Sequence, residues 1–508
     1  MMDFTRSSGV LLHITSLPGD YGSGTFGKTA LKFIDHLAEA GCRYWQILPL
    51  GPIDGFYSPY CSLSAFAGNP YFIDPDTLYE NGLLTKQEIQ SIKIESPWTS
   101  DYQTITQTRI PLLKRAFSRA DQALINKVKN YLESEGDWLK DYALYCAIRD
   151  AYNGQEWYDW DNAALRAHQS EAVHQAFEDY RDDLLFYAFL QYLFAFQWQT
   201  IHHYASEKGV KIIGDMPIYV SLASADVWGN QALFDLDSKG RPKHVAGVPP
   251  DYFSADGQLW GNPLYRWDVM KKDDYTWWMR RIDHALHMYD TVRIDHFRAF
   301  SDYWSVPADE KTARNGKWLP GPGKDFFDLL FSTYTFDEPR IIAEDLGVVD
   351  DNLTQLLQDT ALPGMRVLQF GFIEDGDNQH LPHNYVKNCF AYTGTHDNNT
   401  LLGFMWELTP DKRNYAFDYI NYSPEGEAWK EGGPQSASCR AFIRALWMSS
   451  ASVAIVPVQD LCGFGADTKM NHPGIADGNW AFRLPDDVLD HIDWQWLAHL
   501  NAVYKRQM

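Results

Sequence analysis

Short runs of apolar and β-branched residues recur along this chain, and each run ends in a polar residue or a glycine. Continuous apolar runs of this length are typical of strands that are buried on both faces of a parallel sheet. Eight segments share the pattern: 9–14, 44–50, 210–215, 291–295, 340–344, 364–370, 390–395 and 452–458.

Helical patterns fall between many of these predicted strands. The stretch 29–40 places Phe33, Leu37 and Ala40 on one stripe, and the stretch 277–289 repeats that spacing. Eight strands that alternate with helices predict an α/β fold of the (β/α)8 TIM barrel class. We expect residues 1–508 to form this single catalytic domain.

The predicted strands are unevenly spaced. Residues 51–209, after the second strand, are rich in helical patterns, as at 110–117 and 138–152. Residues 216–290, after the third strand, are rich in glycine, proline and aromatic residues. We expect both segments to be large insertions on the C-terminal loop face, where barrel enzymes build their sites.

Two neighbouring predicted strands end in carboxylates. The fourth reads TVRIDHF and the fifth reads RIIAEDLG, so Asp295 and Glu344 lie at adjoining strand ends. Retaining glycosyl transfer needs one carboxylate nucleophile and one carboxylic acid, about 5–5.5 Å apart. Neighbouring strand ends of a barrel can supply that pair.

Side-chain alternation selects among the acidic residues. Arg293 and Asp295 share one face of the fourth strand, where the guanidinium would keep the carboxylate ionised and oriented. On the fifth strand Glu344 faces one way and Asp345 the other, so Glu344 is the acid/base candidate. A third candidate, Asp397, follows the seventh strand in YTGTHDNNT.

Each of these residues also has a structural interpretation. An isolated Arg-x-Asp on a strand is more often a simple ion pair, and the chain carries a second RIDH at residues 281–284. The apolar neighbours of that second copy have helical spacing, so we interpret it as part of a helix. Three carboxylates at three strand ends favour the catalytic interpretation for the first copy.

The composition and net charge of the chain favour some classes of binding partner over others. The formal net charge of −23 makes nucleic acid and anionic membrane surfaces poor partners, whereas a neutral sugar is compatible with it. Apolar residues make up 45 % of the chain, enough for a large core. The apolar stretch 184–196 is too short to span a bilayer and predicts a buried helix.

The cysteines indicate in which cellular compartment the protein is expected. Six scattered cysteines lack metal-ligand spacing and have mostly apolar neighbours, which predicts buried free thiols in a reducing environment. The N-terminus lacks a secretory apolar region. We expect a cytoplasmic protein that needs neither a metal nor another cofactor.

Many ordered motifs resemble glycoside hydrolase family 77, the amylomaltases and plant disproportionating enzymes. They include SGVLLHITSLPG, YWQILPLGP, SPYCSLSAFAGNPYFID, IIGDMPIYV, AGVPPDYFSADGQLWGNPLYRW, VRIDHFRAF, IIAEDLG and YTGTHDNNT. The resemblance implies a 4-alpha-glucanotransferase that acts on α-1,4-glucans and maltooligosaccharides. It also implies that Asp295 is the nucleophile, Glu344 the acid/base and Asp397 the transition-state stabiliser. The substrate-binding residues that it implies are Tyr60, Asp215, Asp251, Trp260, Arg293 and His396.

One motif departs from the family pattern. After the eighth strand the family usually reads close to LGxEARMN, whereas this chain reads FGADTKMN, with Lys469 where arginine is common. Lysine and arginine differ in hydrogen-bond geometry, so this loop leaves acceptor preference open. Donor length, cyclic products and oligomeric state also stay open.

Two other functions compete with the transferase. An α-glucan hydrolase of the amylase type would use the same chemistry, but the chain ends soon after the eighth strand, without the C-terminal β-domain that amylases usually carry. A catalytically dead glucan-binding protein would have lost one of the three carboxylates, and all three are present.

Overall fold

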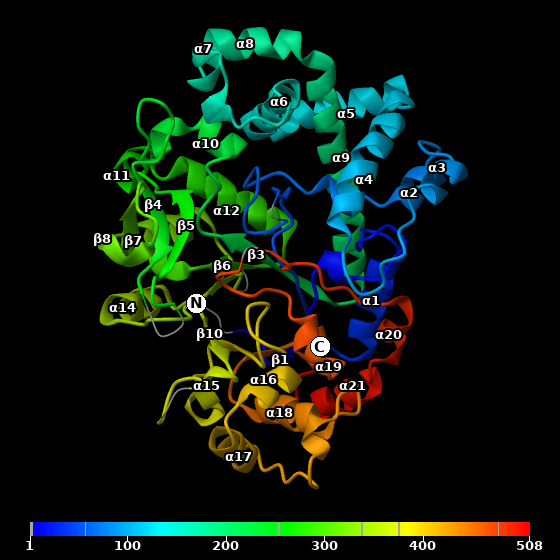
Figure 1. Ribbon diagram of the computed structural model, residues 1–508, viewed down its shortest axis with the longest axis vertical. Coiled ribbons are helices and arrows are strands. Elements are labelled where there is room, and N and C mark those ends of the chain that lie inside the picture. Colours follow the sequence, from blue (N-terminus) through cyan, green and yellow to red (C-terminus); the bar gives the residue numbers. More distant parts are fainter. Residues whose placement is uncertain (1–3, 56, 251–253, 337–338, 374–375, 476) are drawn as a thin grey trace.

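A computed structural model describes all of residues 1–508 except 1–3, 56, 251–253, 337–338, 374–375 and 476. Eight parallel strands form its centre in the order β10-β11-β12-β1-β2-β3-β6-β9 (Figure 1). The strands are β1 (Ser7–Leu11), β2 (Tyr44–Gln46), β3 (Lys211–Pro217), β6 (Thr291–Asp295), β9 (Ile341–Ala343), β10 (Gly364–Val367), β11 (Cys389–Tyr392) and β12 (Val453–Pro457).

The sheet closes on itself. The N–H of Ala343, at the end of β9, donates to the carbonyl of Pro363, which directly precedes β10, at 2.9 Å. The predicted (β/α)8 barrel is therefore confirmed, and every predicted strand has its counterpart. Several strands are shorter than predicted: β2 ends at Gln46, and Phe370 begins a short helix. The rest of these apolar runs leaves the ladder and leads into the loops above the barrel.

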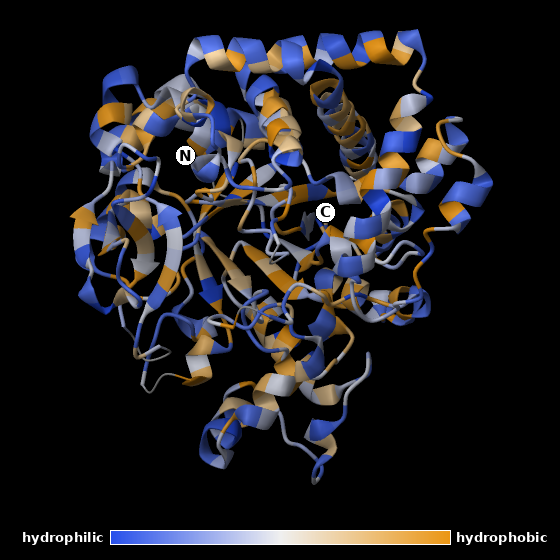
Figure 2. Cartoon of the chain, turned by 45° about the horizontal axis from the view of Figure 1, so that its top comes forward, coloured by the Kyte–Doolittle hydropathy of each residue, from blue (hydrophilic) through white to orange (hydrophobic). Residues whose placement is uncertain are grey.

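Helices precede or follow each barrel strand. They are α1 (Lys28–Glu39), α9 (Arg181–Glu207), α12 (Thr276–Met288), α13 (Gly323–Thr333), α14 (Asp351–Thr360), α15 (Phe370–Ile373), α16 (Leu401–Glu407), α17 (Pro410–Tyr419), α18 (Ala437–Met448), α19 (Val458–Leu461), α20 (Asp486–His491) and α21 (Trp494–Val503). The second RIDH lies inside α12, as predicted from its helical spacing. In Figure 2 the central strands are mainly apolar, while outer helices carry both polar and apolar faces.

The segment between β2 and β3 is largely helical. It comprises α2 (Pro75–Glu80), α3 (Lys86–Gln90), α4 (Tyr102–Ser118), α5 (Gln122–Glu135), α6 (Asp137–Ala151), α7 (Ala163–Arg166) and α8 (Ser170–Asp179), and it ends in α9. Helices α5 to α8 lie together at the top of Figure 1. The predicted buried helix at 184–196 is confirmed within α9. There Gln191 satisfies its amide by bonding both backbone groups of Gly68.

A second sheet was not predicted from the sequence. It is antiparallel, in the order β5-β4-β7-β8, and lies at the left of Figure 1. Strands β4 (His244–Val248) and β5 (Gln258–Pro263) follow β3, together with α10 (Ala225–Gly229) and α11 (Trp267–Met270). Strands β7 (Asp302–Pro307) and β8 (Lys317–Pro320) come from the segment after β6. Such short, partly exposed strands give too little alternation to be recognised singly.

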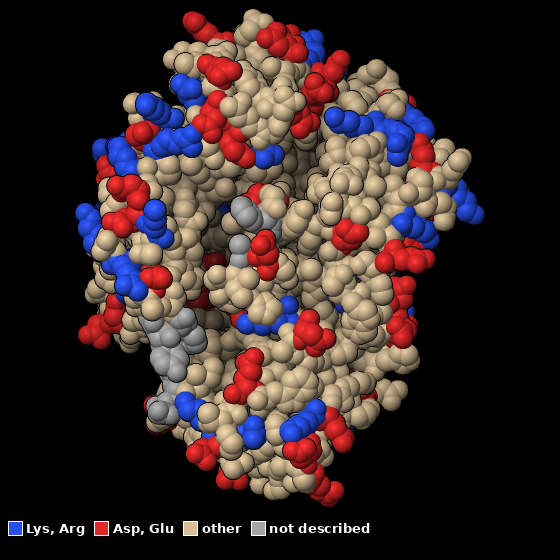
Figure 3. Space-filling model, viewed as in Figure 1, with Lys and Arg blue, Asp and Glu red and all other residues tan. Residues whose placement is uncertain are grey.

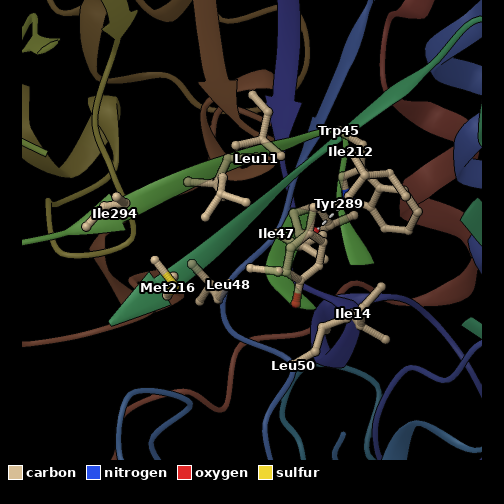
Figure 4. Close-up of a cluster of buried hydrophobic side chains, with 14 of the residues drawn as sticks. Leu11, Ile14, Trp45, Ile47, Leu48, Leu50, Ile212, Met216, Tyr289 and Ile294 are labelled. Atoms are coloured by element: carbon tan, nitrogen blue, oxygen red, sulfur yellow. Dashed lines mark hydrogen bonds between the residues drawn. The ribbon is translucent and has the colours of Figure 1, made fainter. Parts of the chain in front are cut away.

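The barrel core brings together residues that are distant in sequence. Leu11, Ile212 and Ile294 are buried, and Figure 4 shows them in one cluster with Trp45 and Tyr289. Gly214 on β3 makes room for this packing, because a Cβ there would lie 2.2 Å from the ring of Tyr289. Among the described residues, no helix has the length and apolar character to cross a membrane.

Candidate active site

Register places the carboxylates next to one another. On β3 and β6, Asp215 pairs with Arg293 and Pro217 pairs with Asp295. On β6 and β9, Ile294 pairs with Ala343, so Glu344 follows directly at the adjoining strand end. Because all barrel strands run parallel, their C-terminal ends open on the same face.

Arg293 connects two of the carboxylates. One terminal nitrogen donates to both oxygens of Asp215 at 2.8 Å, and the other lies 2.9 Å from Oδ1 of Asp295. Burial alone would lower the pKa of Arg293, but Asp215 and Asp295 hold it well above its ordinary value. The predicted pairing of Arg293 with Asp295 is thus present, and the fixed guanidinium orients that carboxylate.

Tyr60 extends this network towards the cleft. Its hydroxyl donates to Oδ2 of Asp215 at 2.7 Å. Burial, reinforced by the charge of Asp215, raises the pKa of Tyr60 well above its ordinary value, so the phenol stays protonated. Its ring stacks on His396, with centroids 5.2 Å apart and planes 19° apart. A segment from the β2–β3 connection is thereby fixed over strands β3 and β11.

Glu344 occupies an environment that favours its protonated form. Burial raises its pKa to about 8, and the charge of Asp295 adds to the rise while Arg293 opposes it. Its Oε2 accepts from the N–H of His296, and its Oε1 from the N–H of Leu346, both at 2.7 Å. His296 adopts a left-handed backbone, with φ of 51°, directly after β6. The side chain is thus held in place yet can carry a proton near neutral pH.

Asp345 faces away from this cluster, as alternation predicted. It accepts from the N–H of Met365 at 2.6 Å and from Arg366 at 3.0 Å, so it ties β9 to β10. Glu344 and Asp345 are adjacent acids with different roles, one in the site and one in the barrel wall.

Asp397 enters from the loop after β11. Asn471 donates to its Oδ1 at 2.6 Å, and Nε2 of His396 lies 3.3 Å from its Oδ2. The Asp397 side chain is 44 % exposed, whereas His396 is buried. An exposed carboxylate that is held from behind can receive sugar hydroxyls from the cleft side.

Trp260 lies at the rim of the site on β5. Its ring meets His296 edge-on, with centroids 4.8 Å apart, and it remains 36 % exposed. The predicted binding residue Asp251 lies outside the described residues. The face drawn in Figure 3 is hollowed near its centre, and acidic atoms are visible in the hollow.

The sequence reasoning missed several residues of this site. Asn471 belongs to the quoted FGADTKMN motif, but nothing in the motif alone indicated that it would bind Asp397. Trp480 tilts against both Tyr60 and His396, at 5.6 and 5.9 Å, and its GNW context carries no recognisable pattern. His13 is buried close to His396, and burial lowers its pKa to about 3, so it stays neutral. Within the described ranges, no group of three or more His, Cys, Asp or Glu side chains could hold a metal ion.

These features define a class of protein. A closed parallel barrel carries, at adjoining strand ends, a guanidinium-bound carboxylate and a second carboxyl group with a raised pKa. This combination is typical of enzymes that cleave or transfer glycosyl groups with a pair of carboxyl groups.

Comparison with known proteins identifies the family. The family model described as 4-alpha-glucanotransferase matches residues 12–489, and the chain belongs to this family, glycoside hydrolase family 77. It is 39 % identical to the 4-alpha-glucanotransferase of Aquifex aeolicus over 99 % of this chain and 100 % of that one. It is 42 % identical to that of Thermus thermophilus over 95 % of both chains.

Solved structures give the same result. An amylomaltase from Streptococcus agalactiae in complex with acarbose has a TM-score of 0.94 and 38 % identity, covering 99 % of this chain and 100 % of that one. An amylomaltase from Corynebacterium glutamicum, at 17 % identity and a TM-score of 0.79, shares the fold over 99 % of this chain and 75 % of that one. The chain is therefore a 4-alpha-glucanotransferase in activity, and the alternative of an amylase-type hydrolase is not favoured.

Proposed function

We propose that this enzyme moves segments of α-1,4-glucan to the 4-hydroxyl of an acceptor glucan or glucose by double displacement at Asp295. The observation that carries the proposal is the pairing of an Arg293-bound carboxylate with Glu344, whose pKa is raised to about 8. The first can attack while ionised, and the second can donate a proton at neutral pH.

In the first displacement, a carboxylate oxygen of Asp295 attacks the anomeric carbon and forms an ester bond. The bond from that carbon to the leaving O4 breaks, and Glu344 gives its proton to O4. In the second displacement, the ionised Glu344 takes the proton of an acceptor 4-hydroxyl as that oxygen attacks the same carbon. The bond to Asp295 breaks, so the configuration is retained.

The remaining residues bind and orient the sugar. Asp397, half-exposed and held by Asn471, accepts hydroxyl groups and favours the distorted, oxocarbenium-like ring. The Tyr60 ring covers an apolar sugar face, while Asp215 and His396 fix that ring from behind. Asp251 and Trp260 are the proposed binding residues for the acceptor glucan. The two insertions of the single catalytic domain, 51–209 and 216–290, enclose the cleft.

Neutral maltodextrins are the proposed substrates, since the network offers carboxylates, hydroxyls and aromatic faces, and Asp215 and Asp295 already pair with the guanidinium of Arg293. The proposed compartment is the cytoplasm. All six cysteines are free thiols, five buried and Cys61 half-buried, which suits a reducing environment. A plant relative from Solanum tuberosum, 40 % identical over 96 % of this chain and 84 % of that one, is named as chloroplastic or amyloplastic.

Incubation with maltotriose alone tests the proposal. Transfer gives glucose plus a ladder of longer chains, with almost no net rise in reducing ends. Because water is about 55 M, this outcome needs an oriented acceptor and effective molarities far above that of water, which oriented sites do reach. Trp260→Ala should shift the products towards hydrolysis. Reducing ends that climb in step with glucose in the wild type would make the enzyme a hydrolase and overturn the proposal.

A further inference from the structure

Arg298 is a buried arginine that the proposed reaction does not use. It lies two residues after His296, in the helical turn that follows β6, and is only 7 % exposed. One terminal nitrogen donates to the carbonyl of Val348, and the other donates to Oδ2 of Asp350. The second nitrogen also lies 2.8 Å from Oδ1 of Asp302, at the start of β7. One guanidinium thus joins three segments that are separate in the sequence.

Two of the segments that Arg298 joins carry the hydrogen-bond donors of Glu344. The N–H of His296 binds Oε2 of Glu344, and the N–H of Leu346 binds Oε1, both at 2.7 Å. Leu346 lies two residues before Val348, so the carbonyl that Arg298 binds belongs to the same loop as this donor. Arg298 therefore connects the two backbone donors of Glu344 to each other.

Asp350 fixes the far end of the loop that follows Glu344. Its Oδ1 caps α14 by accepting from the N–H of Leu353 at 2.9 Å, while its Oδ2 accepts from Arg298. Burial alone would raise the pKa of Asp350, but the N–H of Leu353 and the guanidinium of Arg298 hold it below its ordinary value. The carboxylate therefore stays ionised at neutral pH, and its pairing with Arg298 joins the loop to the start of α14.

The second sheet covers Arg298. The guanidinium carbon lies 4.1 Å from the centre of the Trp318 ring on β8, and Trp304 on β7 meets that ring edge-on at 5.2 Å. Stacking on an indole while pairing with carboxylates uses the planar geometry of a guanidinium, which lysine lacks. In Figure 1, β7, β8 and α14 all lie at the left of the molecule. The antiparallel sheet thus contributes Trp318 and Asp302 to the surroundings of Arg298.

We propose that Arg298 is a positioning residue that holds the two backbone donors of Glu344 in place and so fixes the orientation of this carboxyl group. The inference rests on the proposed function, in which Glu344 is both the acid and the base. Two fixed N–H groups leave the carboxyl group little freedom to rotate, and misplacement of a reacting group by about 1 Å has large effects on rate. The same donors stabilise the ionised form that the second displacement needs.

The groups that face Glu344 act on it differently from Arg298. Burial raises the pKa of Glu344, Arg293 on β6 lowers it, and Asp295 on β6 raises it. His296 stays neutral, because burial lowers its pKa to about 4. Arg298 is already paired with two carboxylates, so it acts on Glu344 through the positions of the backbone donors.

Arg298→Met tests this role, because it keeps an unbranched side chain that can stay buried but has no hydrogen-bond donor. On maltotriose, kcat should fall about 10–100-fold with a smaller change in KM. The alkaline limb of kcat/KM should move upwards by about one pH unit, because the lost N–H bonds no longer favour ionised Glu344. With a glycosyl fluoride donor, whose leaving group needs no acid, kcat/KM should change much less. Arg298→Lys should recover part of kcat, since it keeps the charge but loses the planar fork.

Arg440 on α18 provides a matched control. It stacks on the ring of Trp496 at 4.7 Å, donates to the carbonyl of Pro434 at 2.7 Å, and pairs with Asp493, which caps α21. These bonds repeat those of Arg298, at a helix that lies on the opposite side of Figure 1 from α14. Arg440→Met should lower the melting temperature to a similar extent but leave kcat and the pH profile unchanged.

Three results would overturn the positioning role. Wild-type kcat and an unmoved alkaline limb in Arg298→Met would show that other contacts position Glu344. Equal losses with maltotriose and with the fluoride donor, at an unmoved limb, would make Arg298 a general structural residue. The same shift in Arg440→Met would attribute it to lost stability. If Arg298→Met does not fold, Asp350→Asn decides: it keeps a capping oxygen but loses the ion pair, and a wild-type limb there contradicts the proposal. The activity of Glu344→Gln tests the proposed function separately.

Discussion

At the scale of single residues, the motif RIDH occurs twice in the chain, in different surroundings. Asp295 ends a barrel strand beside buried Arg293, whereas Asp283 lies on α12 with its side chain 46 % exposed and 3.5 Å from His287. The aspartate of the same four-residue motif is thus a nucleophile candidate at Asp295 and part of a surface pair at Asp283.

Substitution of the two aspartates separates these roles. Asp295→Asn keeps the shape but loses the nucleophile, so kcat on maltotriose should fall by about 10⁴-fold while glucan binding persists. Asp283→Asn should keep near-normal kcat, because its ion pair is exposed. Product analysis and retention in amylose-containing native gels measure both effects. An active Asp295→Asn variant would contradict the assignment of the strand end.

Glu344 links activity to pH. With its pKa raised to about 8 by burial and by Asp295, the free enzyme carries the required proton through neutral pH and loses it above about 8. We therefore expect kcat/KM for maltotriose to fall on the alkaline side with an apparent pKa near 8. Glu344→Gln should lose most activity on maltodextrin but retain more with a glycosyl fluoride donor, whose leaving group needs no acid. Equal loss with both donors would exclude Glu344 as the acid.

The raised pKa of Glu344 also predicts that the free energy of unfolding depends on pH. An unfolded glutamate deprotonates near 4.5 and the folded one near 8, so between these values the folded state binds more protons. The free energy of unfolding therefore decreases as pH rises through this window. As the pH rises from 4 to 8.5, the melting temperature of Glu344→Gln should therefore increase relative to that of the wild type, whatever the offset between the two at pH 4. A constant difference in melting temperature across that range would contradict the raised pKa.

At the scale of elements, the short helix α19 fixes the loop between β11 and α16 through hydrogen bonds. Asp460 on that helix is buried, and it accepts from Oγ1 of Thr393 at 2.6 Å and from the N–H of Leu401 at 2.7 Å. These two donors bracket the segment that carries His396 and Asp397. We therefore expect Asp460 to act by positioning this loop.

Asp460→Asn replaces one acceptor oxygen with a donor that faces another donor. The loop should shift, and kcat should fall by about 10–100-fold with a smaller change in KM, since misplacement of about 1 Å has effects of this size. Thr393→Val removes only one of the two bonds and should lose less. Full kcat in a folded Asp460→Asn variant would show that the loop is positioned by other contacts.

At the scale of the whole molecule, the C-terminal segment stabilises the end of the barrel where its strands begin. Arg506 is fully buried and donates to four backbone carbonyls, those of Ser7, Trp447, Ser449 and Ser452. Burial lowers its pKa to about 9. One side chain therefore joins the chain end to β1, β12 and the end of α18.

Arg506→Ala should weaken the fold without touching the site. It removes the hydrogen bonds of a fully buried guanidinium and leaves a cavity where that side chain packs, so we expect a loss of about 3 kcal/mol. The half-life of activity at elevated temperature should shorten, while KM for maltotriose stays unchanged. Arg444→Ala, which removes an exposed guanidinium stacked 6.0 Å above the ring of Tyr504, should have little effect. An equal loss in both variants would contradict the special role of Arg506.

The sequence by itself determined the barrel and the placement of its principal carboxylates. Continuous apolar runs mark buried parallel strands, and alternation along a strand decides which side chains share a face. Both are local properties, so the pairing of Arg293 with Asp295 and the opposite directions of Glu344 and Asp345 were predictable. Strand bounds were predicted too long where apolar runs continue into loops.

Only the tertiary structure decided what surrounds those carboxylates. The raised pKa of Glu344 depends on burial by the whole fold, and the contacts of Asp397 with Asn471 and of Tyr60 with His396 join segments far apart in sequence. The antiparallel sheet β5-β4-β7-β8 is likewise assembled from two separate connections. Such contacts arise from packing in three dimensions, where hydrogen bonds and burial join residues that no local periodicity relates.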